Sequence, residues 1–242
     1  MLVAAVQYAP KFKDVVGNRS AMVSLVREAV QRGAKLVVLP ELCTTGYSFM
    51  SVEDAQPYAE DLMQSGGTLS VMENLAGQFG VAIAWGVMEK DHGTGKLYNS
   101  QVLTLSDRTF VSYRKVNRFA NDFIWAEEGR GSPPITEFMG KKIGLLICRD
   151  VRDKAPAWSD FYEKGDADIV AFSANWGAGG FPSVNWIRFV KENETFLVVS
   201  NRYGKEANND FGEGGVCIIE PSGKVHCEGL VWDQPCIVYA NI

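Results

Sequence analysis

The sequence predicts an α/β protein in which a mixed β-sheet, or two sheets, is covered by helices. Short apolar runs typical of buried strands alternate with longer segments whose apolar residues recur at helical spacing. Several strand-like runs are separated only by a short turn, which indicates antiparallel hairpins. Because 46% of the 242 residues are hydrophobic and no linker, repeat or low-complexity tract interrupts them, we expect one domain over residues 1–242.

The first forty residues predict a strand, a helix and a second strand, as in a βαβ unit. The first strand is expected over residues 2–7, which are mostly apolar. In residues 18–33 apolar side chains recur every three or four positions, so we expect a helix capped by Asn18 and ended by Gly33. Residues 35–39 predict the second strand, which a proline ends.

The middle of the chain predicts a helix followed by three strands. An amphipathic helix is expected over residues 68–79, where a glycine follows it. Residues 81–88 predict a buried strand, and residues 98–105 and 108–113 predict an antiparallel hairpin. A polar and aromatic loop is expected over residues 117–134.

The apolar run that ends at Ile147 predicts a buried strand whose carboxyl end carries Cys148. Ligands of α/β proteins usually bind at this edge of a sheet. A turn or helix beginning at Arg149 would point backbone N–H groups at the sulfur. The remaining elements are expected in this order: helix 157–164, strand 168–173, helix 185–195, strand 196–200, a glycine turn at 212–215, and closing strands 216–219 and 236–240.

The charge and the hydropathy exclude several classes of partner. A net charge of −5 argues against a surface for nucleic acid or anionic lipid. No apolar run has the length that a membrane span needs, and the first residues lack the charged and apolar regions of a signal peptide. We therefore expect a cytoplasmic protein with a small-molecule partner and neither nucleic acid nor membrane.

Cysteine and histidine usage narrows the chemistry. The five cysteines are odd in number, widely spaced and without a CxxC pair, which indicates a reducing compartment and argues against a disulfide framework or zinc site. The two histidines both lie in polar, glycine-containing loop contexts. This scarcity disfavours a Cys–His or Ser–His pair and a His-rich metal site, so an activated cysteine would need another type of base.

Three chemically complementary residues follow strand-like runs, namely Glu41, Lys115 and Cys148. If the strands are neighbours, a carboxylate base, a cation that favours thiolate and stabilises an oxyanion, and a nucleophile would meet at one rim. Each has a simpler interpretation: Glu41 as a solvated or helix-capping carboxylate, Lys115 as a surface cation, and Cys148 as a small buried apolar residue.

Sequence blocks covering residues 3 to about 223 resemble the carbon–nitrogen hydrolase, or nitrilase-like, superfamily. The blocks are AAVQYAP, Asn18 in the first helix, GAKLVVLPELCTTGY, LYNSQVL, SYRKVNRF, GLLICRDVR, FSANW, WIRFVKENETFLVVSNRYG and a glycine-rich segment after Phe211. Their order and spacing are more specific than any single motif.

The resemblance implies a fold, a chemistry and an assembly. The fold would be a four-layer αββα sandwich with two mixed sheets, forming homodimers or higher homo-oligomers by helix packing. Glu41 would be the general base, Cys148 the nucleophile and Lys115 the oxyanion stabiliser, without metal or cofactor. A thioester would form with loss of ammonia or an amine and then be hydrolysed.

The sequence departs from the superfamily pattern near the lysine and after the cysteine. Many members carry a second glutamate several residues after the lysine, where this chain has Asp122; alternatively Glu127 or Glu128 takes that place. Asn117 stands where a histidine is common, and residues 153–155 replace the usual Phe-Pro-Glu. These differences affect the substrate expectation rather than the catalytic set.

Three further residues are candidates for substrate binding. Trp176 either walls the acyl site or plugs the edge of the sheet, and Tyr47 either lines the mouth or belongs to the core. Arg149 either binds a substrate carboxylate or pairs with Asp122 or Asp150.

The function expected first is an amidase that releases ammonia from a small linear amide through a cysteine thioester. A nitrilase and an N-carbamoyl amine hydrolase use the same three residues, although Arg149 stands where nitrilases often have tryptophan. A non-catalytic binding protein on the same fold is a different class, which the intact Glu41, Lys115 and Cys148 argue against. A thiol oxidoreductase would need a second cysteine close to Cys148, and none is near in sequence.

Overall fold

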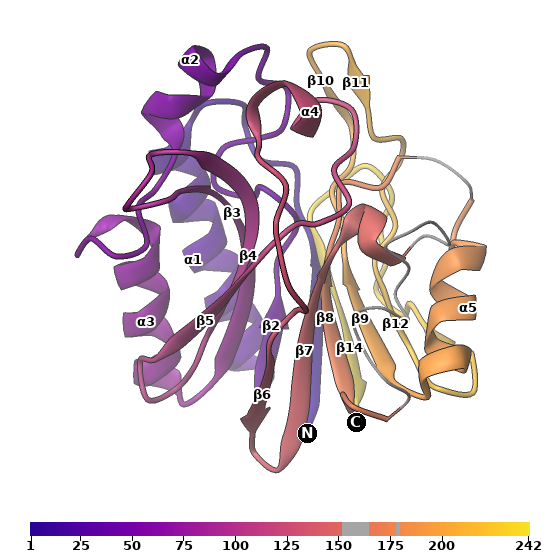
Figure 1. Ribbon diagram of the computed structural model, residues 1–242. Coiled ribbons are helices and arrows are strands. Elements are labelled where there is room, and N and C mark those ends of the chain that lie inside the picture. Colours follow the sequence, from indigo (N-terminus) through magenta and orange to yellow (C-terminus); the bar gives the residue numbers. More distant parts are fainter. Residues whose placement is uncertain (152–164, 178–179) are drawn as a thin grey trace.

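Two six-stranded mixed sheets pack face to face, and helices cover their outer faces (Figure 1). The computed structural model describes residues 1–151, 165–177 and 180–242. The four layers are α1 (Val15–Gln31) with α3 (Gly67–Phe79), the first sheet, the second sheet, and α5 (Val184–Asn193). The expected four-layer αββα sandwich is confirmed.

The first sheet has the order β14-β1-β2-β3-β4-β5. β1, β2 and β3 are parallel, while β14, β4 and β5 pair antiparallel. The predicted hairpin is therefore confirmed as β4–β5. The bounds are β1 Leu2–Gln7, β2 Leu36–Val38, β3 Ala82–Lys90, β4 Leu97–Thr104, β5 Phe110–Arg114 and β14 Cys236–Asn241.

The second sheet has the order β13-β12-β9-β8-β7-β6. β7, β8 and β9 are parallel, and the outer strands pair antiparallel. The bounds are β6 Ile135–Phe138, β7 Lys141–Ile147, β8 Ile169–Ser173, β9 Phe196–Ser200, β12 Cys217–Ile219 and β13 Val225–His226. The short edge strands β6 and β13 were not predicted, because two to four residues carry little periodicity.

The central strands are apolar on both faces because each face has its own core. Along β1, Val3 and Ala5 pack between the sheets, whereas Ala4 and Val6 pack under α1 and α3. β2 and β3 divide their residues in the same way. This burial on two faces explains why the strands appear in the sequence as continuous apolar runs rather than as alternating ones.

The first helix begins earlier than predicted. Its N-cap is Asp14, whose side chain accepts from the Gly17 amide. Asn18 lies inside the helix, is buried, and accepts a hydrogen bond from the Tyr8 hydroxyl at 2.7 Å. The capping role predicted for Asn18 is therefore wrong, although Gly33 does follow the helix end with φ 91°.

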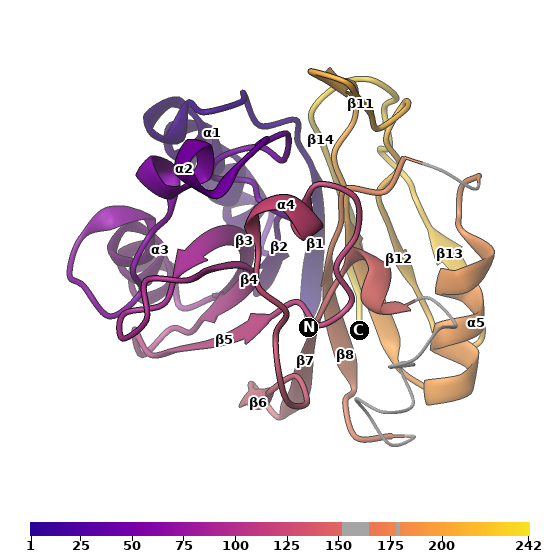
Figure 2. The same ribbon diagram turned by 45° about the horizontal axis from the view of Figure 1, so that its top comes forward.

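Small elements cover the carboxyl ends of the central strands (Figure 2). They comprise α2 (Val52–Ala55) with the 3-10 turn η1 (Gln56–Tyr58), α4 (Asp122–Trp125), the 3-10 turn η2 (Cys148–Val151) and a hairpin of β10 (Lys205–Glu206) and β11 (Asn209–Asp210). α4 lies in the segment that was predicted as a loop. The helix predicted over residues 157–164 lies outside the described residues.

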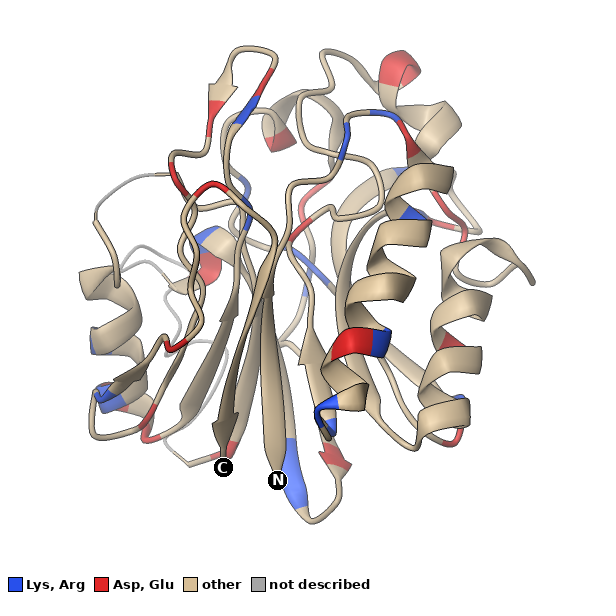
Figure 3. Ribbon diagram, turned by 180° about the vertical axis from the view of Figure 1, so that it is seen from behind, with Lys and Arg blue, Asp and Glu red and all other residues tan. Residues whose placement is uncertain are grey.

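Charged residues lie mainly on helices, loops and strand ends, and the sheet interiors carry few (Figure 3). Within the part of the chain that the structure describes, no helix combines the length and apolarity of a membrane span.

Candidate active site

Glu41, Lys115 and Cys148 meet at the carboxyl ends of strands from both sheets and share a cavity of about 160 Å³. Glu41 follows β2, Lys115 follows β5, and Cys148 follows β7. The predicted convergence is therefore confirmed. The cavity is lined by Glu41, Tyr47, Lys115, Phe119, Ala120, Cys148, Arg149, Asn175, Trp176, Gly177, Asn209, Asp210 and Phe211.

The turn that carries Glu41 lies directly against strand β3, and Gly86 makes this possible. A Cβ atom at Gly86 would lie 2.4 Å from the Leu42 nitrogen and 2.7 Å from the Glu41 Cα. Glu41 is 1% exposed. Its Oε1 accepts hydrogen bonds from Lys115 and Asn99, but its Oε2 has no partner among the described residues. An unoccupied carboxylate oxygen beside Cys148 is suited to accept a proton.

Lys115 is 2% exposed, and its ammonium lies between two carboxylates. Nζ donates to Glu41 Oε1 at 2.6 Å and to Asp122 Oδ2 at 2.7 Å. Burial alone would lower the pKa of Lys115, but the charges of Asp122 and Glu41 raise it well above its usual value. An ammonium has three N–H donors, so one is left for a substrate oxygen.

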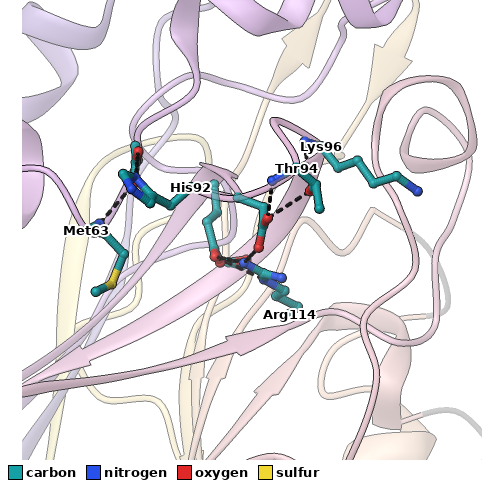
Figure 4. Close-up of polar contacts among 9 residues, drawn as sticks. Met63, His92, Thr94, Lys96 and Arg114 are labelled. Atoms are coloured by element: carbon teal, nitrogen blue, oxygen red, sulfur yellow. Dashed lines mark hydrogen bonds and ion pairs between the residues drawn. The ribbon is translucent and has the colours of Figure 1, made fainter.

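The backbone around Lys115 is fixed from two sides. Arg114, on the opposite face of β5, forms ion pairs with Glu89 and Asp91 (Figure 4). On the other side the Gly129 amide donates to the Lys115 carbonyl at 2.9 Å, and a Cβ at Gly129 would lie 2.0 Å from the Arg114 carbonyl oxygen. The structure thus gives a reason for a glycine at this position.

Asp122, rather than Glu127 or Glu128, is the second carboxylate of the site. It is fully buried at the start of α4 and also accepts from the Asn99 side chain at 3.0 Å. Glu127 pairs with Lys96 and Glu128 with Arg118 outside the cavity, and both are largely exposed. Asn99 on β4 thereby bridges Glu41 and Asp122, a role that sequence reasoning missed although the residue lies in a matched block.

Cys148 lies at the sharp turn from β7 into η2, with φ 44° and 7% exposure. A positive φ is rare outside glycine and indicates local strain at the position that presents the sulfur. Burial and then the charge of Glu41 raise the pKa of Cys148, while Lys115 and the backbone N–H of Asn175 lower it. The net direction is upward, so the resting group is a thiol.

Lys115 does lower the pKa of Cys148, as expected, but it does not set the net direction. The single positive charge of Lys115 is outweighed by the two carboxylates that it contacts, Glu41 and Asp122. The resulting net negative charge, together with burial, disfavours a second anion at the sulfur. A base must therefore remove the proton during the reaction.

Asp150 stabilises the turn after Cys148. Its carboxylate accepts from the Asn117 amide, the Ile147 amide and the Tyr113 hydroxyl. Burial raises the pKa of Asp150 to about 6, although Lys115 and these donors lower it. Its oxygens are thus occupied by the backbone around the nucleophile.

Tyr47 and Trp176 both line the cavity, which was one of the two interpretations open for each. The Tyr47 hydroxyl donates to the Phe119 carbonyl, and burial raises the pKa of Tyr47. Trp176 is held by two hydrogen bonds with Asn201, at 2.8 and 3.1 Å. Trp125, in contrast, is buried against Phe49 rather than placed over the cavity.

The β10–β11 hairpin supplies the wall that sequence reasoning did not anticipate. Asn209 and Asp210 belong to it and Phe211 follows it. Glu206, also on the hairpin, accepts from the Tyr47 and Ser48 amides at 2.7 and 2.8 Å. Gly177 permits the close approach of this wall, because a Cβ there would lie 2.6 Å from the Asp210 carbonyl oxygen.

The sequence model of the Carbon-nitrogen hydrolase family matches residues 2–242. A nitrilase of Pyrococcus abyssi is 34% identical over 224 residues, which cover 92% of this chain and 82% of the relative. The chain belongs to the carbon–nitrogen hydrolase family. A protein N-terminal amidase of Schizosaccharomyces pombe is 26% identical, with 96% of this chain and 95% of the relative covered.

The fold comparison agrees. A solved structure of a carbon–nitrogen hydrolase superfamily protein from Xanthomonas campestris, with an arsenic adduct in its active site, superimposes with a TM-score of 0.84. The two chains are 25% identical, and the match covers 99% of this chain and 89% of that one.

Proposed function

We propose that this member of the family is an amidase, which hydrolyses a small linear amide to a carboxylic acid and ammonia. The observation that carries the proposal is the geometry around Cys148: a buried thiol shares its cavity with Glu41, whose Oε2 is unoccupied, and with the doubly paired Lys115. The family match to residues 2–242 supports treating the chain as one carbon–nitrogen hydrolase domain.

In the first half-reaction the Cys148 sulfur attacks the amide carbon while Glu41 Oε2 takes the thiol proton. The oxyanion accepts a hydrogen bond from the free N–H of Lys115, and the backbone N–H of Arg149 is a second candidate donor. The C–N bond breaks as Glu41 returns the proton to the leaving nitrogen, which departs as ammonia. A thioester remains on Cys148.

In the second half-reaction Glu41 takes a proton from water, and the resulting hydroxide attacks the thioester carbon. The tetrahedral intermediate collapses with release of the acid, and the proton returns to the sulfur. In this scheme Asp122 and Asn99 are positioning residues, because they contact Lys115 and Glu41 rather than the cavity.

The size of the cavity favours a short substrate. Its volume of about 160 Å³ lies below the roughly 300–1,000 Å³ of pockets for drug-sized ligands. Tyr47 and Trp176, which we propose as substrate-binding residues, limit its width. A nitrile is the second candidate substrate, since a relative at 34% identity is named nitrilase.

The test is release of ammonia from short aliphatic amides and the matching nitriles. We expect turnover of amides by the wild-type protein and its loss, by at least about a thousandfold, in Cys148→Ala. Cys217→Ala is the matched control, since this buried thiol lies on β12 and does not line the cavity. Turnover retained in a folded Cys148→Ala protein would contradict the proposal. A homodimer and a cytoplasmic location stay predictions.

A further inference from the structure

Arg149 is a cation that lines the cavity and contacts an aromatic ring there. Its guanidinium lies over the Phe119 ring, 4.9 Å from the ring centroid, and both residues line the cavity. Of the two carboxylates that could have paired with it, Asp122 is bound to Lys115 and Asp150 is held by Tyr113 and two backbone amides. Within the described residues, no carboxylate lies within ion-pair distance of Arg149.

The cation–π contact with Phe119 does not use the N–H donors of Arg149 in a hydrogen bond. A guanidinium stacks through its face, while its N–H donors point outward in its plane. The Phe119 backbone is itself fixed, because its carbonyl accepts from Tyr47 and its amide donates to Asp122 at 3.0 Å. The backbone that carries the Phe119 ring is therefore held in place beside Arg149.

The rest of the cavity is lined mainly by aromatic side chains, with a few polar groups among them. Tyr47, Phe119, Trp176 and Phe211 form apolar walls between the polar groups. The amide group of Asn175, which also lines the cavity, has neither a donor nor an acceptor partner among the described residues. The carboxylate of Asp210 is held by Lys205 and the Gly212 amide.

We propose that Arg149 binds a carboxylate at the end of the substrate distal to the reacting amide, so that the preferred substrates are half-amides of short dicarboxylic acids. The inference rests on the proposed amidase function and names its substrate class. A planar guanidinium binds a carboxylate through two parallel N–H···O bonds, which fixes its orientation. The amide end would then be directed at Cys148, next to Arg149 in the chain.

The first experiment compares each carboxylate substrate with a neutral one of the same shape. Succinamate is paired with 4-methylpentanamide, and glutaramate with 5-methylhexanamide, because an isopropyl group has the shape of a carboxylate. We expect kcat/KM to favour the carboxylate by roughly 10- to 100-fold, as for a hydrogen-bonded charged group. Equal or better turnover of the neutral amides would overturn the proposal.

The second experiment measures the same ratio in variants. Arg149→Gln should reduce the preference to about one or below, chiefly through KM for the carboxylate substrates, and Arg149→Lys should retain part of it. Arg130→Gln removes the same charge at an exposed position outside the cavity and should keep the wild-type ratio. A preference that survives Arg149→Gln would contradict the assignment.

A binding measurement separates this inference from the proposed function. By calorimetry, Cys148→Ala should bind glutarate, and the double variant with Arg149→Gln should bind it at least about tenfold more weakly. If amides release ammonia without a carboxylate preference, the subsite is wrong and the amidase stands. If no amide in the panel is hydrolysed, the proposed function fails, and equal glutarate binding by the two variants would reject the subsite independently.

Discussion

At the scale of single residues, the protonation of Cys148 follows from its burial and from the charges around it. Lys115 is shared between Glu41 and Asp122, so the group carries a net negative charge before the thiol ionises. Burial is the largest cause that places the pKa of Cys148 above its usual value, and the charge of Glu41 is the next. Cys148 is therefore a thiol at rest, and the proposed mechanism assigns the removal of its proton to Glu41.

This protonation state predicts how the thiol reacts with methyl methanethiosulfonate. Because the thiolate fraction below the pKa grows tenfold per pH unit, the labelling rate of Cys148 should rise about tenfold per unit from pH 7 to pH 9 without levelling. Glu41→Gln removes a charge that raises the pKa of Cys148, so labelling at pH 8 should become faster while amide turnover falls. Mass spectrometry of pulse-labelled protein measures both rates.

Two comparisons make the labelling prediction specific. Glu127→Gln changes an exposed carboxylate outside the cavity and should leave the Cys148 rate unchanged. A labelling rate that levels near neutral pH would indicate a resting thiolate and would refute the charge argument. Burial of Cys148 slows its labelling by the same factor at every pH. The slope of the labelling rate with pH therefore still reports the thiolate fraction.

At the scale of elements, the position of Glu41 depends on strand β3. Gly86 lies in the middle of this strand, where its backbone contacts the turn that carries Glu41, and its amide donates to the Pro40 carbonyl at 3.1 Å. The three nearest atoms to an added Cβ are all backbone atoms of Pro40, Glu41 and Leu42. A flexible side chain could move aside, but this backbone could not without moving the base.

Gly86→Ala should therefore displace Glu41 and lower kcat by at least about tenfold, because a base shifted by a fraction of an ångström transfers protons less well. Overpacking should also reduce the free energy of unfolding by about 1–3 kcal/mol. Gly93→Ala is the control, since its Cβ would meet only a side-chain oxygen of Asp91 at 3.7 Å. Full activity in Gly86→Ala would show that the turn tolerates the shift.

At the scale of the whole molecule, the cavity is closed by contacts between distant parts of the chain. Glu206 on the β10–β11 hairpin accepts from Tyr47 and Ser48 in the N-terminal half and is paired with Arg202 at 2.9 Å. The Arg202 guanidinium in turn lies 4.1 Å from the Phe211 ring centroid. This buried ion pair thus positions two cavity walls, Tyr47 and Phe211, at once.

Replacing Glu206 by Gln should affect both stability and substrate binding. Breaking a buried ion pair leaves Arg202 without its counter-charge, so we expect the free energy of unfolding to fall by about 3 kcal/mol in chemical denaturation. KM should rise more than kcat falls, since the walls move but the catalytic groups do not. Lys205→Gln breaks only an exposed ion pair with Asp210. It should leave both the free energy of unfolding and KM nearly unchanged. Unchanged stability in Glu206→Gln would mean that the pair contributes nothing.

The sequence by itself determined the order of the central strands and helices. It also identified the three residues that meet in the cavity, Glu41, Lys115 and Cys148. Buried strands and amphipathic helices have apolar patterns that are visible within a few neighbouring residues. Glu41, Lys115 and Cys148 each come after a strand with such a pattern. Two- to four-residue edge strands and the β10–β11 hairpin have no such repeat and were not predicted.

Only the tertiary structure decided what surrounds these three residues. It placed Asp122 rather than Glu127 or Glu128 on Lys115, joined Asn99 to Glu41 across 58 positions of the chain, and left Arg149 unpaired within the described residues. It also reversed the expected pKa direction of Cys148. Such properties depend on burial and on the summed charges of residues that are distant in sequence, and no local pattern contains that sum.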